Sequence, residues 1–272
     1  MSGRYGRVLL TGAAGRIARQ LRPLLAPHCE TLLLLDREPV GELAPNEQVI
    51  HADLADASTL AQVLGGVQAI VHFAGYPREA PWDTLMPANV IGVANLWEAA
   101  ASAGVERIVY ASSNHAVGFY PRDTQLDHQV VPRPDSRYGV TKVFMEALAS
   151  MHADKHGLRA FGMRIGHCAE RPSDARMLSH WIHPEDMAAL VHVGLSADYL
   201  CETVYGVSDN ARSWWDNSRA EQLGYRPKHS ADARAEALQS VRESDPVAER
   251  YQGGSFAAID YAGDPERPAA AR

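Results

Sequence analysis

Cysteine is scarce in this chain of 272 residues, which contains only Cys29, Cys168 and Cys201. The three lie far apart, and their spacing matches neither a metal site nor a disulfide framework. We therefore expect reduced thiols that act as small apolar side chains, as is usual in a reducing compartment.

Long hydrophobic runs are also missing. A membrane-spanning helix needs about 18 apolar residues, whereas runs such as Thr31–Leu35 are only long enough for a strand. Residues Met1–Arg7 lack the apolar segment and the small-residue cleavage site of a signal peptide. With 46% hydrophobic and 22% charged residues, the composition is that of a globular domain. These features predict a cytoplasmic protein without a membrane partner.

An excess of basic charge is absent as well. Lys and Arg number 26 against 33 Asp and Glu, which gives a formal net charge of −7. A nucleic-acid partner is not expected, because such proteins carry a basic face. An anionic small-molecule ligand would therefore need a local cation of its own.

Continuous apolar segments alternate with amphipathic ones over the first two-thirds of the chain. The apolar segments are Val8–Leu10, Thr31–Leu35, Ala69–Phe73, Arg107–Ala111 and Arg159–Ile165, and helices are predicted from Ile17 to Leu25, Ala88 to Gly104 and Tyr138 to His156. This alternation predicts an α/β fold, a doubly wound parallel sheet of the Rossmann type. Further helices are predicted at Met187–Leu195, Trp214–Leu223 and Ala231–Arg242.

The turn Thr11–Ala18 follows the first strand and opens a helix. Gly12 and Gly15 allow a tight turn and a close approach of the backbone to a pyrophosphate, and the helix N-terminus supplies free N–H groups. An ordinary strand–helix turn is the alternative.

Asp36 ends the second strand, at about the 20-residue offset typical of an acid that binds the adenosine ribose. Its carboxylate favours NAD over NADP, although the neighbouring Arg37 leaves a phosphate contact open. Asp53 and Leu54 are placed to flank the adenine, with a helix N-cap at Asp53 or Asp56 as the alternative.

Tyr138 and Lys142 stand at i and i+4 of a predicted helix and therefore share one face. A phenol has an ordinary pKa near 10, and a nearby ammonium favours the phenolate. Tyr138 is thus a candidate general base. Ser113 ends the preceding strand, where its hydroxyl is placed to orient a substrate oxygen.

These features together resemble the extended short-chain dehydrogenase/reductase superfamily. The Thr11–Ala18 turn, Asp36, Ala74-Gly75, Asn89, Ser113 and Tyr138 with Lys142 occur in the order found there. More narrowly, six segments resemble the bacterial uronate dehydrogenases: Ala111–Pro121, Arg133–Gly139, Arg164–Gly166, Arg176–Trp181, Trp214–Ser218 and Gln252–Phe256. The resemblance implies an NAD-dependent enzyme that oxidises glucuronate or galacturonate at C1 to an aldaro-lactone.

The resemblance also implies roles for individual residues. Tyr138 takes the proton of the anomeric hydroxyl, Ser113 binds that oxygen, and Lys142 holds the nicotinamide ribose. Cofactor contacts are implied for Gly12, Ala14, Gly15, Arg16, Ile17, Asp36, Arg37, Asp53, Leu54, Phe73, Ala74, Gly75, Asn89, Ala111, Tyr138, Lys142, Ile165 and Cys168. Substrate contacts are implied for Pro77, Ser113, Asn114, His115, Tyr138, His167, Arg176 and Phe256, with Arg176 binding the carboxylate.

The chain departs from the family pattern at three positions. Ala18 replaces the third glycine of the turn, where a small residue suffices. Pro77 and His167 each stand where serine is usual, so the substrate contacts at these two positions are open.

By this resemblance, residues 1–166 form the NAD-binding core, 167–259 a small substrate-binding lobe interleaved with it, and 260–272 a loose tail. The apolar faces of Ala88–Gly104 and Tyr138–His156 favour a homo-oligomer.

Two alternative functions stay open at this stage. The chain could be a sugar-nucleotide epimerase or dehydratase of the same superfamily, or a non-catalytic dinucleotide sensor. Arg164 fits a structural ion pair as well as a ligand contact. His180 and His183 have the spacing of a helical metal site, but Pro184 is expected to separate them, so no metal is predicted.

Overall fold

The computed structural model describes residues 4–265 and contains one large parallel sheet. Its order is β3-β2-β1-β4-β5-β6-β9, and all neighbours pair in parallel. The strands are β1 (Tyr5–Thr11), β2 (Cys29–Asp36), β3 (Glu47–His51), β4 (Ala69–His72), β5 (Arg107–Ser113), β6 (Arg159–Ile165) and β9 (Cys201–Gly206). The reversal of strand order between β1 and β4 confirms the predicted doubly wound sheet.

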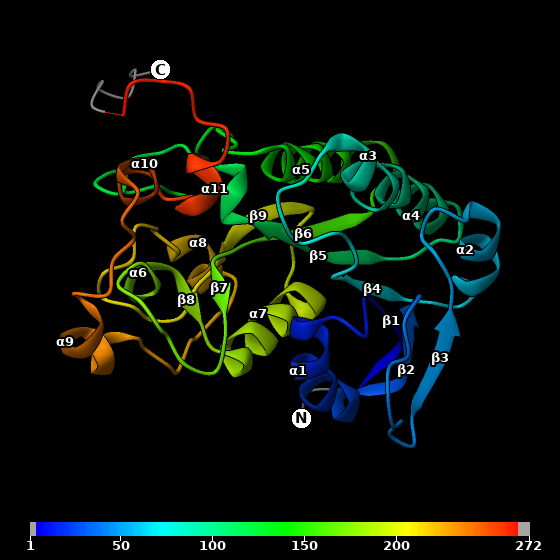
Figure 1. Cartoon of the computed structure of the whole chain (residues 1–272). Helices are drawn as coiled ribbons and strands as arrows, with labels where there is room; N and C mark the ends of the chain where they lie inside the picture. The colour runs from blue at the N-terminus through cyan, green and yellow to red at the C-terminus, as the bar shows by residue number, and fades with distance from the viewer. Residues whose placement is uncertain (1–3, 266–272) are drawn as a thin grey trace.

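Helices cover both faces of the sheet (Figure 1). α1 (Arg16–Leu25) and α7 (Pro184–Ser196) pack against one face, and α2 (Ala57–Val63), α4 (Gly92–Ser102) and α5 (Arg137–His156) against the other. Successive strand residues are therefore buried on opposite sides. Leu10 and Leu34 belong to the first core, whereas Leu9 and Leu33 belong to the second, which is why these strands are apolar at every position.

The helix predicted at Ala88–Gly104 differs from the structure at its start. Helical backbone begins with α3 (Trp82–Leu85), continues through the π-helical turn η2 (Met86–Ile91) and ends with α4. The wider π turn accommodates Pro87, which has no N–H to donate.

The remaining elements are short. η1 (Ala26–His28) leads into the amino end of β2, and the others lie beside the carboxyl ends of the strands (Figure 1). The others are η3 (Asn114–Ala116), β7 (His167–Cys168), α6 (Met177–His180), β8 (Trp181–Ile182), α8 (Ser218–Gln222), η4 (Asp232–Arg234), α9 (Ala235–Leu238), α10 (Pro246–Arg250) and α11 (Ser255–Ala258).

Two helix predictions were too long. The helix predicted at Trp214–Leu223 is only α8, because Trp215 stacks on Tyr205 at 4.7 Å and Asn217 hydrogen-bonds the backbone of Tyr205 at both N–H and C=O. These contacts keep the segment extended. The helix predicted at Ala231–Arg242 is reduced to η4 and α9.

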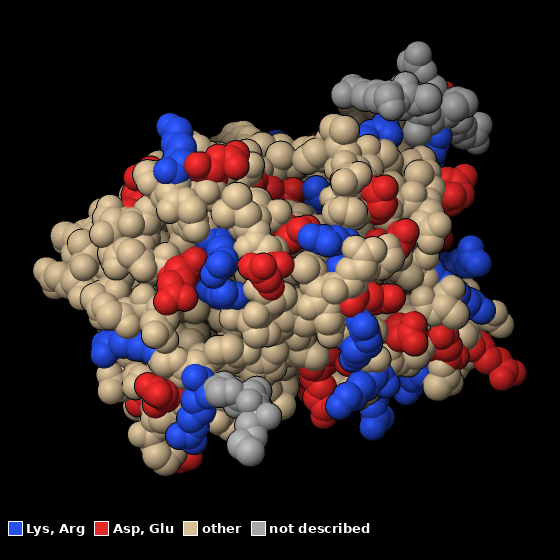
Figure 2. Space-filling model, turned by 180° about the vertical axis from the view of Figure 1, so that it is seen from behind, with Lys and Arg blue, Asp and Glu red and all other residues tan. Residues whose placement is uncertain are grey.

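The ends and the surface add three observations. Residues 1–3 and 266–272 lie outside the described residues, and with them part of the segment Met1–Arg7 and most of the predicted tail. Between residues 4 and 265, no helix combines the length and apolar character needed to cross a bilayer. Basic and acidic side chains are interspersed over the face shown in Figure 2.

Candidate active site

The glycine-rich turn between β1 and α1 is packed too closely for side chains. Gly12 has φ +70°, and a Cβ there would lie 2.6 Å from the backbone nitrogen of Ala74. A Cβ on Gly15 would lie 2.9 Å from the carbonyl oxygen of Gly12. Ala18, which stands where the family pattern has a third glycine, is buried. The N–H groups of the turn bond within the fold: Gly12 N and Ala13 N donate to Leu35 O, Ala14 N to Asp36 Oδ2 and Gly15 N to Gly12 O.

The cleft beside this turn has a volume of about 380 Å³ and lies over the ends of β1, β2 and β4. Ten residues predicted to contact cofactor or substrate line it: Gly12, Gly15, Asp36, Arg37, Asp53, Leu54, Phe73, Ala74, Gly75 and Pro77. Leu35, Ala52, Tyr76, Thr84, Pro87 and Ala88 line it as well and were missed, since nothing in their residue types signals a ligand.

Asp36 is held at the mouth of this cleft by two backbone amides. Its Oδ2 accepts from Ala14 N and its Oδ1 from Glu38 N, both at 2.9 Å. Arg37 forms an exposed ion pair with Asp53 at 3.2 Å. The N-cap of α2 is Asp56, whose carboxylate accepts from two amides, so Asp53 is free to line the cleft.

Other predicted cofactor residues lie around the cleft rather than in its lining. Asn89 is buried, and its amide bonds Tyr76 N, Tyr76 O and Thr141 Oγ1. It ties the loop after β4 to α5. Arg16 donates to the carbonyl oxygen of Cys168 across the turn.

Ser113, Tyr138 and Lys142 come together where β5 ends against α5. Burial raises the pKa of Tyr138 to about 12, and a hydrogen bond with Ser113 opposes this shift. Lys142 Nζ donates to Ala111 O at 2.8 Å and lies 5.4 Å from the centre of the Tyr138 ring. Burial also lowers the pKa of Lys142 to about 8. Because desolvation is the largest cause of this raised pKa, the phenol keeps its proton near pH 7 in the protein alone.

Glu79 fixes the start of α5 and was missed by the sequence analysis. Its Oε2 accepts from Tyr138 N and its Oε1 from Arg137 Nη1, both at 2.8 Å. The carboxylate is only 6% exposed. Arg137 also bonds Asp260, so three segments meet beside Tyr138.

An imidazole lies directly beside the phenol. The His115 ring packs edge-on to Tyr138 at 5.7 Å and stacks on Phe256 at 4.0 Å. Its Nδ1 lies 2.7 Å from Oδ2 of Asp135, a buried carboxylate that the sequence analysis did not single out. The three predicted residues His115, Tyr138 and Phe256 thus form one cluster.

Arg176 supplies a partly buried cation close to this cluster. Its Nε and Nη2 donate to the carbonyl oxygen of Gln252. With the Asn114 amide turned so that both of its polar atoms are bonded, its oxygen accepts from Arg176 Nη2 at 3.0 Å and its nitrogen donates to Ile165 O. Within residues 4–265, no carboxylate lies at ion-pair distance from Arg176. Burial, together with Arg122, lowers its pKa to about 10.

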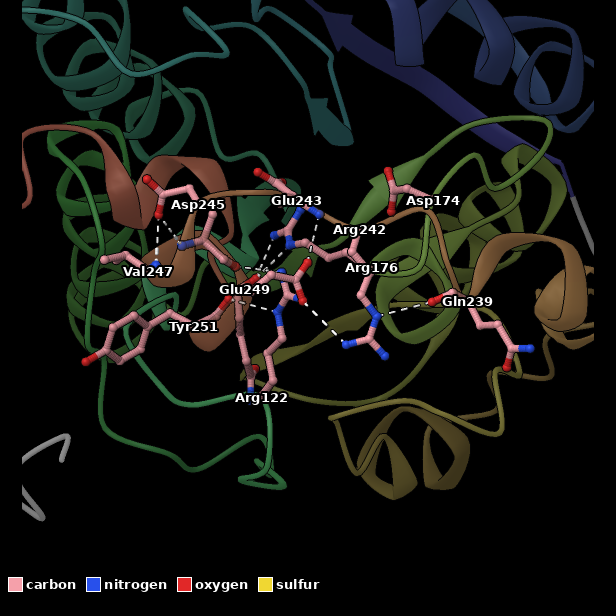
Figure 3. A network of polar contacts seen from close by, with 12 residues as sticks. Arg122, Asp174, Arg176, Gln239, Arg242, Glu243, Asp245, Val247, Glu249 and Tyr251 are labelled. Atoms are coloured by element: carbon pink, nitrogen blue, oxygen red, sulfur yellow. Dashed lines mark hydrogen bonds and ion pairs between the residues drawn. The ribbon is translucent and has the colours of Figure 1, made fainter. Parts of the chain in front are cut away.

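The neighbouring cations have partners of their own. Arg122 pairs with Glu249 at 3.0 Å, as Figure 3 shows, and lies over the Trp214 ring. Arg164 forms a buried ion pair with Glu146 at 2.9 Å. Of the two alternatives for Arg164, a structural ion pair or a ligand contact, the structure therefore favours the ion pair. Of these three guanidinium groups, Arg176 is the one without a carboxylate at ion-pair distance among residues 4–265.

His180 and His183, whose spacing is also that of a helical metal site, lie on different elements, because His180 ends α6 and His183 is the N-cap of α7. His183, Glu185 and His229 do offer ligand atoms within 4.8 Å of one another. However, the two rings stack at 3.7 Å and 21°, so their in-plane lone pairs run nearly parallel and do not converge on one ion.

Comparison with known proteins places the chain among close relatives. The sequence model of the NAD dependent epimerase/dehydratase family matches residues 8–184. The uronate dehydrogenase of Pseudomonas putida is 41% identical over 93% of this chain and 96% of its own length. A variant of the Agrobacterium tumefaciens uronate dehydrogenase, solved with NAD, has a TM-score of 0.89 at 40% identity, covering 93% of this chain and 97% of that one. The glucuronic acid dehydrogenase of Chromohalobacter salexigens also has a TM-score of 0.89 at 40% identity, covering 96% and 98%.

Proposed function

The chain belongs to the uronate dehydrogenases of the NAD dependent epimerase/dehydratase family, and we propose that it oxidises a hexuronic acid at C1 with NAD⁺. The single observation that carries the proposal is Arg176, a guanidinium without a carboxylate partner among the described residues, beside the Ser113–Tyr138–Lys142 group. A sugar acid supplies the missing carboxylate. A neutral aldose leaves this partly buried charge unpaired, which is costly.

The cleft over β1, β2 and β4 fits NAD by its own geometry. A side chain at position 12 would collide with the backbone of Ala74, so only glycine leaves the turn open for a pyrophosphate. Asp36 offers its remaining lone pairs to the ribose hydroxyls and repels a 2′-phosphate. When bound there, the oxidised nicotinamide supplies the hydride acceptor and a positive charge.

In the proposed reaction Tyr138 receives the proton of the anomeric hydroxyl while the C1–H bond breaks with its electron pair, and the C1–O bond becomes the lactone carbonyl. Ser113 holds the oxygen on which negative charge develops. Lys142 and the positive charge of the cofactor bring the pKa of Tyr138 down from its raised value. His115 and Asn114 bind sugar hydroxyls, and Arg176 binds the carboxylate.

We also propose that the protein acts in the cytoplasm as a homo-oligomer, with residues 1–166 binding the cofactor and 167–259 completing the substrate site. Support for oligomer formation comes from Val140 and Met151 on α5 and Ile91 in η2, which are apolar and 37–46% exposed.

Mixing the purified protein with NAD⁺ and glucuronate or galacturonate, and following NADH absorbance, tests the function. We expect NADH to form from NAD⁺ and either uronate. We expect no NADH from NAD⁺ and glucose, and no NADPH when NADP⁺ replaces NAD⁺. Tightly bound NAD that copurifies with the protein, with no net NADH formed from a uronate, would instead support an epimerase or dehydratase.

A further inference from the structure

His180 is a buried imidazole for which the mechanism above has no role. It is the last residue of α6, and 1% of it is exposed. Its ring lies among other rings, with centroids 5.8 Å from Trp214, 6.4 Å from Trp215 and 6.4 Å from His167. Arg176 is the N-cap of the same short helix, four residues earlier and in helical conformation. The two side chains therefore share one face, one turn apart.

The two ring nitrogens of His180 differ in their surroundings. Nδ1 is buried and has no hydrogen-bond partner. Nε2 also makes no hydrogen bond to residues 4–265. Unlike Nδ1, however, it is accessible to solvent. Nε2 is therefore the polar atom of this ring that a ligand can reach.

The tautomer follows from this asymmetry. A buried N–H without an acceptor is rarer in proteins than a buried acceptor without a donor. The ring proton is therefore better placed on Nε2, where a ligand oxygen can accept it, than on the sealed Nδ1. His180 thus presents a neutral N–H donor to the accessible side of its ring.

The charges around His180 indicate what kind of oxygen it would meet. Burial is the largest cause that holds the pKa of His180 well below its usual value, followed by the charges of Arg176, His167, His115 and Arg122. All of these groups are basic side chains, and two of them have acidic partners of their own, His115 with Asp135 and Arg122 with Glu249. An anionic oxygen bound to Arg176 would be the natural acceptor for the Nε2–H.

We propose that His180 is a specificity-determining residue whose Nε2–H donates to the carboxylate of the substrate, one helical turn from Arg176. This assignment rests on the proposed oxidation of a uronate and adds a second donor to its acid end. His167, which stands where serine is usual in the family, packs next to His180 and so belongs to the same group of rings.

The test compares two polar substitutions that differ only in reach. In His180→Gln the side-chain amide extends to the position of Nε2, whereas in His180→Asn it extends only to that of Nδ1. We expect His180→Asn to raise KM for glucuronate about tenfold or more, as for loss of a hydrogen bond to a charged group, with kcat little changed. His180→Gln should keep most of the affinity. His152→Phe, which removes another fully buried imidazole on α5, is the matched control and should leave KM unchanged.

Equal KM values in His180→Asn and wild type, or equal increases in the Asn and Gln variants, would overturn the proposal. Equilibrium binding of glucuronate to the protein–NADH complex gives the same comparison without turnover and also covers a variant of low stability, with thermal melting reported beside it. Failure of the wild type to form NADH from any uronate contradicts the proposed function. Unchanged glucuronate binding in His180→Asn contradicts only the role of His180.

Discussion

His115 and Asp135 form a short hydrogen bond beside the Tyr138 phenol, with Nδ1 and Oδ2 2.7 Å apart and the carboxylate fully shielded from solvent. The other carboxylate oxygen, Oδ1, accepts from the Ser136 hydroxyl. Gly118 and Gly253 lie so close to Asp135 that a Cβ on either would be 1.8 Å from Oδ2. These contacts favour the tautomer with the proton on His115 Nδ1, so that Nε2 is the acceptor in the sugar contact proposed above.

Replacing Asp135 by Asn should reverse this arrangement. An amide that donates to Nδ1 moves the ring proton to Nε2, so the group facing the sugar changes from acceptor to donor. We expect kcat/KM for a uronate to fall about 10–100-fold, while the NAD dissociation constant stays unchanged. Asp127→Asn, on a remote loop, is the control. A variant with normal kcat/KM would contradict the role given to Asp135.

Removing the phenol of Tyr138 should abolish proton transfer. Tyr138→Phe keeps the ring that packs against His115 and Phe256, so the fold should be preserved. We expect turnover to fall by at least about 100-fold, the usual contribution of a positioned base. NAD binding by calorimetry should persist. Normal turnover in this variant would rule out Tyr138 as the base.

The rate should rise with pH. Burial raises the pKa of Tyr138 to about 12, so the phenol is protonated at neutral pH and must lose its proton to act as a base. Raising the pH increases the deprotonated fraction, up to about tenfold per pH unit below the pKa that holds in the complex with cofactor. A profile of kcat/KM that falls from pH 6 to pH 9 would contradict this mechanism. Measurements at constant ionic strength keep surface charge effects equal.

Asp36 should control the choice between NAD and NADP. Asp36→Asn retains an acceptor for Ala14 N but removes the charge that repels a 2′-phosphate, next to Arg37 in its exposed pair with Asp53. We expect the ratio of kcat/KM for NAD⁺ over NADP⁺ to fall at least about tenfold. Glu38→Gln, on the same loop, should leave the ratio close to that of the wild type. An unchanged ratio in Asp36→Asn would assign cofactor choice elsewhere.

The buried pair Arg164–Glu146 should contribute strongly to stability. The two side chains are 4% and 10% exposed, and Ser112 also donates to the Glu146 carboxylate. Glu146→Ala leaves the guanidinium buried without its partner, which we expect to lower the free energy of unfolding by about 3–5 kcal/mol. Urea titration measures this. Asp198→Asn removes an exposed partner of Arg159 and should cost less than about 1 kcal/mol.

The sequence by itself determined the parallel sheet, the glycine turn and the groups that follow the strands. These features depend on local chemistry: continuous apolar strands, the positive φ of Gly12, and side chains such as Asp36 and Ser113 that directly follow or end a strand. The motifs also sufficed to indicate the family, which the comparisons confirm. The edge strand β9 was not evident, because it is set by long-range pairing with β6. The shortness of α8 was not evident either, because it follows from the stacking of Trp215 on Tyr205.

Only the tertiary structure decided which groups act together. Glu79 lies 59 residues before Tyr138, Asp135 lies 20 after His115, and Gln252 lies 76 after Arg176. No spacing rule connects such pairs. The raised pKa of Tyr138 and the sealed Nδ1 of His180 are likewise effects of burial, which depends on segments distant in the sequence. Hydrogen-bond geometry and desolvation are properties of packed neighbours, so they appear only once the chain has folded.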